Sequence, residues 1–134
     1  DDATLERLVA SNLLGPLRMV RAALPHLVGG FVVILSAVVA EQPPAGMVAY
    51  TATKAGLTAA DTALRREVRR QRIEVIDVRP PHTETGLADR PIAGAAPDLP
   101  PGVAPDVVAE VIVAAIEDGA REVPASAFTT GAAR

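Results

Sequence analysis

The sequence contains no cysteine and no tryptophan, and its only aromatic residues are Tyr50, Phe31 and Phe128. The lack of cysteine excludes disulfides, thiolate metal sites and thiol nucleophiles, and it fits a reducing cytoplasm. The two histidines, His26 and His82, have no partners at ligand spacing, so no metal site is predicted. A lone tyrosine in a chain so poor in aromatic residues directs attention to its surroundings.

An excess of one charge and long apolar runs are also lacking. The 13 basic and 16 acidic residues leave a net charge of −3, which gives no attraction to nucleic acid or to anionic membranes. No apolar run approaches the roughly 18 residues of a membrane helix. The first residues are acidic where a signal peptide would be basic. The sequence therefore predicts a soluble, cytoplasmic protein without nucleic-acid or membrane partners.

Nearly half of the residues, 49%, are hydrophobic, and their spacing predicts regular elements. Three helices are predicted, at residues 2–27, 47–70 and 106–118. Three strands are predicted, at residues 31–35, 73–78 and 121–124, the last one short. The run 31–35 has no polar alternation, which indicates a strand buried on both faces, as in a parallel sheet. Alternating helices and strands favour a layered α/β fold.

Two segments of this pattern stand out. Residues 82–104 are rich in proline, glycine and alanine and are predicted to form a long loop, with a short helix near residues 85–88. The arginines at the end of the second helix are interpreted as a solvated face that complements the helix C-terminus; they are Arg65, Arg66, Arg69, Arg70 and Arg72. Two strands and a fragment make a poor sheet, so we expect further strands from an N-terminal segment.

The segment that carries chemistry is Tyr50-Thr51-Ala52-Thr53-Lys54. Residues at i and i+4 lie on the same helix face. A lysine ammonium beside a phenol favours the phenolate, so Lys54 is expected to lower the pKa of Tyr50. A tyrosine tuned in this way can serve as general acid and base for a carbonyl and alcohol pair. Because the pattern is short, taken alone it is more typical of a surface lysine beside a half-buried tyrosine.

Motifs on either side give the pair a context. Upstream, the strand that begins at Gly30 ends in Ser36, and downstream the strand that ends in Arg79-Pro80 is followed by Thr85. Open α/β sheets bind ligands at the carboxyl ends of their strands. In this order and spacing, Gly-x-x-x-x-x-Ser, Tyr-x-x-x-Lys-Ala and strand-Arg-Pro-x-x-x-x-Thr resemble the short-chain dehydrogenase/reductase family, closely over residues 2–85 and loosely over the final helix.

This resemblance implies a Rossmann-like doubly wound parallel sheet, of which residues 1–134 are the C-terminal half. The N-terminal half that binds the dinucleotide phosphates is absent from the sequence. The implied activity is hydride transfer between NAD or NADP and a small carbonyl or alcohol substrate, with the substrate and the choice of cofactor left open. Tyr50 would be the acid/base, and Lys54 would lower its pKa and bind the nicotinamide ribose.

The resemblance also assigns cofactor contacts after the second strand. The backbone from Pro80 to His82 would contact the carboxamide end of the nicotinamide, and Thr85 would bond the carboxamide or the phosphates. Pro81 stands where the family prefers glycine, and it lacks an N–H. The backbone contact is therefore expected from His82 or Thr83.

The family places an asparagine in the helix before the serine strand, and Asn12 matches it. Pro16, four residues later, has no N–H and cannot bond the carbonyl of Asn12. That carbonyl is therefore expected to be free to hold a water, which in the family relays protons to the catalytic lysine.

The main departure from the family concerns the catalytic serine. The family pattern places it at position 37, which is alanine here, and Ser36 stands one residue early. Adjacent residues at a strand end point to opposite sides, so Ser36 substitutes only if the loop is bulged or shifted. The alternative function is a catalytically weak or silent relative that acts as a dimerising or ligand-binding module.

Small side chains on the first two helices suggest one further feature. They are either core positions or the seam of a homo-oligomer formed through helices 2–27 and 47–70, which family members use in this way; they are Ala10, Gly15, Ala59 and Ala63.

Overall fold

Three parallel strands form the sheet in the computed structural model, which describes residues 1–131. They are β1 (Phe31–Leu35), β2 (Glu74–Val78) and β3 (Glu122–Val123), in the order β1-β2-β3. Phe31 pairs with Glu74 and Leu35 with Val78, so the carboxyl ends of β1 and β2 lie side by side. The predicted parallel sheet is confirmed.

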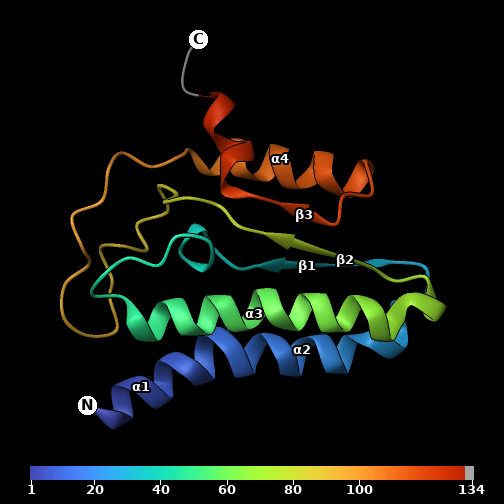
Figure 1. Cartoon of the computed structure of the whole chain (residues 1–134), viewed down its shortest axis with the longest axis horizontal. Helices are drawn as coiled ribbons and strands as arrows, with labels where there is room; N and C mark the ends of the chain where they lie inside the picture. The colour runs from blue at the N-terminus through green and yellow to red at the C-terminus, as the bar shows by residue number, and fades with distance from the viewer. Residues whose placement is uncertain (132–134) are drawn as a thin grey trace.

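Helices cover both faces of this sheet (Figure 1). On one side lie α1 (Asp2–Val9), α2 (Gly15–Ala23) and α3 (Val48–Glu67), and on the other lies α4 (Pro105–Glu117). The layers are those of a Rossmann-like α/β fold, as predicted. Short 3-10 turns complete the structure, at Leu24–His26 (η2), Val38–Ala40 (η3), Val68–Gln71 (η4) and Ala125–Gly131 (η5).

Two details of the predicted elements are wrong. The helix predicted over 2–27 is interrupted by a π-helical turn, η1 (Ala10–Leu14), and ends in η2. No helix forms at residues 85–88, where Gly86 has a φ of +71°. That left-handed conformation breaks a right-handed helix, and glycine adopts it without strain.

The apolar core lies in two clusters, one on each face of the sheet. The first packs Val32 and Ile34 of β1 against Leu57 of α3, and the second packs Ile76 and Val78 of β2 against α4. Side chains alternate between the faces along each strand, so β2, in the middle, is buried on both. Ile76 and Val78 are fully buried, which fixes the strand that leads into the candidate site.

The outer edge of β1 is unpaired in the described part of the chain. Phe31 and Leu35 keep 47% and 48% of their surface exposed, although they belong to the most apolar strand. No helix of residues 1–131 is long and apolar enough to cross a membrane.

Candidate active site

The candidate site lies at the carboxyl ends of β1 and β2. Beyond these strands, the segment after β1 stays beside the segment after β2, because the Val38 N–H donates to the Pro80 carbonyl at 3.0 Å. Helix α3 begins at this same end of the molecule, and the loop that follows β2 passes beside it (Figure 1). The edge thus gathers the segment after β1, the segment after β2 and the first turns of α3.

The structure brings Tyr50 and Lys54 together on α3. The Lys54 Nζ lies 5.7 Å from the centroid of the Tyr50 ring. The same ammonium donates to the Leu35 carbonyl at 3.0 Å, at the end of β1. Both side chains are half-buried. The predicted shared helix face is therefore confirmed, and Lys54 ties this face to the edge strand.

The predicted lowering of the tyrosine pKa is not found in this chain. Burial raises the pKa of Tyr50 above its ordinary value, and burial lowers the pKa of Lys54. Loss of water disfavours the charged form of each group, and here that effect outweighs the attraction between phenolate and ammonium. At neutral pH Tyr50 is a protonated phenol, which is the form that donates a proton.

Asn12 lies in the π-helical turn, partly buried. A π turn inside a helix widens the hydrogen-bond spacing, and such turns are frequent at functional sites. The Gly15 N–H reaches back five residues to the Ala10 carbonyl, and Pro16 follows directly. The sequence argument foresaw a disturbed turn here, but not its π-helical form.

Ser36 is turned into the sheet. It is 2% exposed, and its Oγ donates to Asp77 Oδ1 at 2.5 Å, with the Val78 carbonyl at 3.2 Å. The loop is not shifted by one residue, since the Ser36 N–H stays on the Val78 carbonyl at 2.9 Å. Ser36 is thus engaged with Asp77 rather than with Tyr50, and Ala37 occupies the next position.

The residues assigned to the cofactor follow β2 without regular secondary structure, apart from a bridge between Thr83 and Val103. Thr83 Oγ1 donates to the Pro81 carbonyl at 3.0 Å, and Thr85 is exposed. His82 is partly buried, and its carbonyl accepts from Val103 at 2.8 Å. Pro80 reaches the segment after β1, as described above. These residues therefore line the strand-end edge on the β2 side, and Tyr50 and Lys54 approach it from α3.

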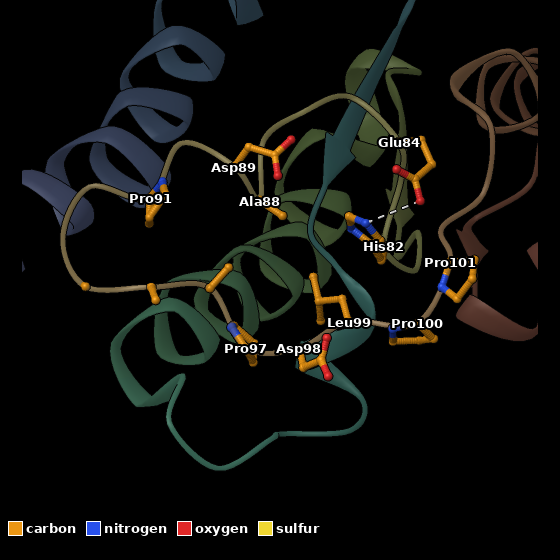
Figure 2. Close-up of a pocket in the computed structure, with 13 residues that line it drawn as sticks. His82, Glu84, Ala88, Asp89, Pro91, Pro97, Asp98, Leu99, Pro100 and Pro101 are labelled. Atoms are coloured by element: carbon orange, nitrogen blue, oxygen red, sulfur yellow. Dashed lines mark ion pairs between the residues drawn. The ribbon is translucent and has the colours of Figure 1, made fainter.

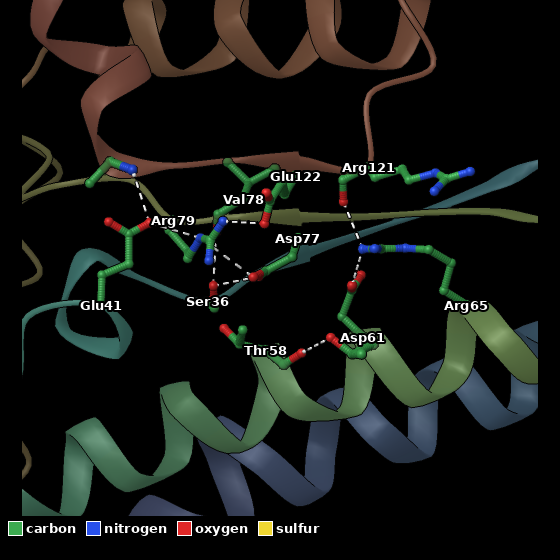
Figure 3. A network of polar contacts seen from close by, with 12 residues as sticks. Ser36, Glu41, Thr58, Asp61, Arg65, Asp77, Val78, Arg79, Arg121 and Glu122 are labelled. Carbon is green, nitrogen blue, oxygen red and sulfur yellow. Dashed lines mark hydrogen bonds and ion pairs between the residues drawn. The ribbon is translucent and has the colours of Figure 1, made fainter.

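Arg79 organises the polar contacts behind this edge (Figure 3). Its guanidinium lies 2.9 Å from Glu41, 3.6 Å from Asp77 and 2.7 Å from Glu122. Glu41 comes from the segment after β1, Asp77 from β2 and Glu122 from β3. The Arg79 guanidinium thus connects the segment after β1 to β2 and β3. Asp77, one of its partners, also accepts the hydrogen bond from the Ser36 hydroxyl.

A second ion pair connects α3 to the sheet (Figure 3). Arg65 pairs with Asp61 one turn earlier on α3, and it also donates to the carbonyls of Val75 at 3.2 Å and Arg121 at 2.7 Å. The interpretation of the arginine cluster as a solvated face is therefore wrong for Arg65. Its neighbours Arg66, Arg69 and Arg70 are exposed, as that interpretation requires.

Asp61 should make the stability of the chain depend on pH. Burial, partly offset by Arg65, raises the pKa of Asp61 to about 6 from an ordinary 3.8. Between these values the folded chain holds this proton more tightly than the unfolded chain. The stabilisation is therefore complete below about pH 4 and is lost as the pH rises to about 6.

Asp61→Asn keeps an acceptor for Arg65, and we expect it to remove on the order of 2–3 kcal/mol of the change in unfolding free energy between pH 4 and pH 7. Urea unfolding at pH 4, 5, 6 and 7 measures it, with Glu110→Gln on the exposed face of α4 as the control. An Asp61→Asn chain with the same pH profile as the wild type would contradict the assignment.

The residues that sequence reasoning missed are Arg79, Glu41, Asp77 and Asp61. A signal existed for the two aspartates, because each interrupts an apolar pattern, in Val75-Ile76-Asp77-Val78 and in Ala59-Ala60-Asp61. Buried charges are paired in proteins, so a partner arginine could have been sought.

Comparisons with known proteins agree with this arrangement. A family model described as short chain dehydrogenase matches residues 1–93. No curated protein matches the chain in sequence. Many solved structures are similar to this chain over most of its length, and three short-chain dehydrogenases are among them.

A short-chain dehydrogenase from Sphingobium yanoikuyae, in complex with NADPH, is 27% identical with a TM-score of 0.80, and the match covers 90% of this chain and 48% of that one. One from Burkholderia cenocepacia, in complex with NADP, is 27% identical with a TM-score of 0.81, covering 93% and 51%. One from Streptomyces avermitilis is 28% identical with a TM-score of 0.74, covering 95% and 55%. The chain thus spans about half the length of these proteins.

Proposed function

Because this chain belongs to the short-chain dehydrogenase family, we propose that it carries the proton-transfer half of an oxidoreductase that uses NAD or NADP. The substrate is a small carbonyl compound or alcohol. The observation that carries the proposal is the Tyr50 phenol held beside the Lys54 ammonium at the carboxyl ends of parallel strands. Similar proteins in complex with NADPH and NADP support the choice of cofactor.

The residues present fit such a cofactor. Lys54 has three N–H donors, and the structure assigns one of them to the Leu35 carbonyl, so others can bond ribose hydroxyls. The backbone from Pro80 to Thr83 follows β2 at this edge, and the His82 and Thr83 N–H groups would be its donors to a carboxamide. When bound, the nicotinamide would supply or accept the hydride. This chain would supply the proton.

Tyr50 acts as the acid in carbonyl reduction. Its phenol is protonated at neutral pH, because the ordinary pKa of tyrosine is 10.0 and burial raises the pKa of Tyr50 further. As hydride reaches the carbonyl carbon, negative charge develops on the oxygen, and the phenol donates its proton there. Lys54, positively charged beside the ring, stabilises the phenolate that remains. The phenolate would then regain its proton from solvent, through a water held at the Asn12 turn and through Lys54, so that both groups return to their starting forms.

We further propose that residues 1–134 are the C-terminal half of one Rossmann domain. The support is the unpaired edge of β1, where Phe31 and Leu35 remain exposed. Beside that edge an apolar groove of about 240 Å³ is lined by residues of α2 and β1, including Met19, Val20 and Leu35. An N-terminal half with the dinucleotide phosphate site would extend the sheet at this edge and fill the groove.

We also propose that the chain forms a homo-oligomer through residues 2–27, which contain α1 and α2, and residues 47–70, which contain α3. Ala10, Ala59 and Ala63 are exposed in the single chain, whereas Gly15 is partly buried, and a Cβ at this position would lie 3.3 Å from the Ala10 carbonyl oxygen. Small exposed side chains allow close approach of a second copy.

A second candidate function rests on the serine position. Ser36 is buried on Asp77 and Ala37 has no hydroxyl, so no serine at this strand end is free to polarise a substrate carbonyl. A catalytically weak relative that serves as a dimerising or ligand-binding module would have this arrangement. The two candidates are distinguished by assaying the protein joined to its N-terminal half for oxidation of NADH or NADPH by a panel of ketones and aldehydes. The decisive variant is Tyr50→Phe, discussed below.

A further inference from the structure

The segment after β1 carries an acidic side chain that turns back to the sheet (Figure 3). Glu41 follows η3, and its Oε1 lies 2.9 Å from Arg79 Nε at the end of β2. The same oxygen accepts from the Ala125 N–H, just beyond β3, at 3.3 Å. The side chain of Glu41 keeps 25% of its surface exposed, so the ion pair is partly shielded from water. Glu41 therefore ties the segment after β1 to residues that follow the other two strands.

Arg79 is itself fixed by the backbone. Its N–H donates to the Val123 carbonyl at 2.9 Å, and its side chain keeps only 14% of its surface exposed. The carbonyl of the next residue, Pro80, accepts from the Val38 N–H at 3.0 Å. The segments after β1 and β2 are thus joined by a side-chain contact at Glu41 and, three residues earlier, by a backbone contact at Val38.

The segment after β2 is also held at its far end. The Val103 N–H donates to the His82 carbonyl at 2.8 Å, and the Glu84 N–H donates to the Val103 carbonyl at 3.0 Å. His82 Nε2 lies 3.6 Å from Glu84 Oε1 (Figure 2). Residues 80–83 are therefore anchored by β2 on one side and by Val103 on the other. The position of the segment after β1 is then set against this anchored stretch.

The three carboxylates around the Arg79 guanidinium have different parts in this arrangement. Asp77 belongs to β2, as Arg79's near neighbour in sequence, so its contact at 3.6 Å holds no other segment. Glu122 lies on β3 at 2.7 Å, but it is 64% exposed, and water and salt screen an exposed pair. Glu41 alone of the three comes from the segment after β1. Comparing Glu41 with Glu122 therefore separates a positioning effect from the mere loss of an ion pair.

We propose that Glu41 and Arg79 are positioning residues, which hold the segment after β1 at a fixed place beside residues 80–83. The inference rests on the proposed function and adds two residues to it. The held segment contains Ala37, at the position of the family serine, and leads to Tyr50 on α3. Residues 80–83 are those assigned to the nicotinamide. Glu41 and Arg79 act through the backbone, by keeping the proton donor and the hydride donor at the separation that the carbonyl requires.

The test compares Glu41→Gln with Glu122→Gln in the protein joined to its N-terminal half. Each variant removes one negative charge beside the same guanidinium and keeps the length of the side chain. We expect Glu41→Gln to lower kcat for a ketone about tenfold at saturating NADPH, because a misplacement of about 1 Å at the reacting groups has a large cost. Glu122→Gln should stay within about twofold of the wild type. An unchanged kcat in Glu41→Gln, or equal losses in both variants, would overturn the inference.

The pairing of Glu41 with Arg79 is tested by a double-variant cycle. Arg79→Lys keeps the positive charge but replaces the planar guanidinium with one ammonium, so an intermediate loss of about threefold is expected. If Glu41 acts through Arg79, the double variant Glu41→Gln, Arg79→Lys should lose about tenfold, as Glu41→Gln does alone. A loss of roughly thirtyfold, the product of the two, would show that the residues act independently and would reject the pairing.

A second measurement separates the inference from the proposed function. In the 134-residue chain, amide hydrogen exchange followed by NMR reports how often the Val38 N–H leaves the Pro80 carbonyl. We expect this exchange to be about fivefold faster in Glu41→Gln and unchanged in Glu122→Gln, with both variants folded by circular dichroism.

If the protein joined to its N-terminal half reduces no ketone, the proposed function fails, and the exchange rates still decide whether Glu41 positions this segment. A Val38 exchange rate in Glu41→Gln equal to that of the wild type would contradict the inference, whatever the activity.

Discussion

Replacing Tyr50 with phenylalanine is expected to lower kcat/KM on the order of 10³-fold in the protein joined to its N-terminal half, which we call the joined protein. The substitution removes one hydroxyl and keeps the ring, so the contact with Lys54 and the packing at the start of α3 remain. Without the phenol, water must deliver the proton to the developing alkoxide. Because the loss concerns the transition state, kcat should fall and KM should change little.

The matched control is Thr62→Val on the exposed side of the same helix, which also removes one hydroxyl. Its activity should stay within about twofold of the wild type, and both variants should keep the wild-type circular dichroism spectrum. If Tyr50→Phe retained activity within a few-fold, the phenol would not be the proton donor, and the weak-relative alternative would be favoured.

Introducing serine at Ala37 is expected to raise kcat/KM by up to about 10²-fold, the order of effect of one donor to a developing oxyanion. Ala37 has an extended backbone, φ −177° and ψ 164°, which serine adopts freely. Its position follows Ser36, whose side chain is turned into the sheet, so a hydroxyl at 37 should point to the other side. That side faces away from Asp77.

Ala45→Ser, in the exposed part of the same connection to α3, controls for the mere addition of a hydroxyl. Initial rates with one ketone and saturating NADPH measure both variants. A large gain in Ala37→Ser alone would mean that the natural site lacks its carbonyl donor. Equal rates for wild type and Ala37→Ser would show that catalysis here needs no hydroxyl at this strand end.

Much of the fold follows from the period of the apolar residues. The run 31–35 is continuously apolar, the segment around 74–78 is rich in β-branched residues although Asp77 interrupts it, and α3 repeats leucine and alanine at helical spacing. Tyr50 and Lys54 are neighbours for the same local reason. The local sequence pattern is enough to predict a contact when both residues belong to the same helix or strand.

The remaining features depend on contacts between distant segments. The direction of Ser36 depends on the register of β1 against β2, which places it on Asp77. Arg79 meets Glu41 and Glu122 only after three strand ends come together. Likewise, the Gly102 N–H donates to the Glu84 carboxylate across a long loop without regular structure. Periodicity within a segment carries no information about such pairings.

Lys54 was predicted to lower the pKa of Tyr50, but burial raises this pKa instead. The lysine does lie beside the ring, yet burial alone moves both groups toward their neutral forms. In the joined protein the cofactor and the added half would change this environment. The chain by itself therefore holds the proton donor in its protonated state.

The central claim is that Tyr50 presents a half-buried, protonated phenol beside the half-buried Lys54 ammonium. It can be measured directly, because Tyr50 is the only tyrosine and there is no tryptophan to interfere. Absorbance at the phenolate band, followed during alkaline titration of the 134-residue chain with circular dichroism recorded in parallel, gives its pKa. The account predicts a midpoint above 10 while the fold persists. A midpoint at or below 10, with the chain still folded, would contradict it.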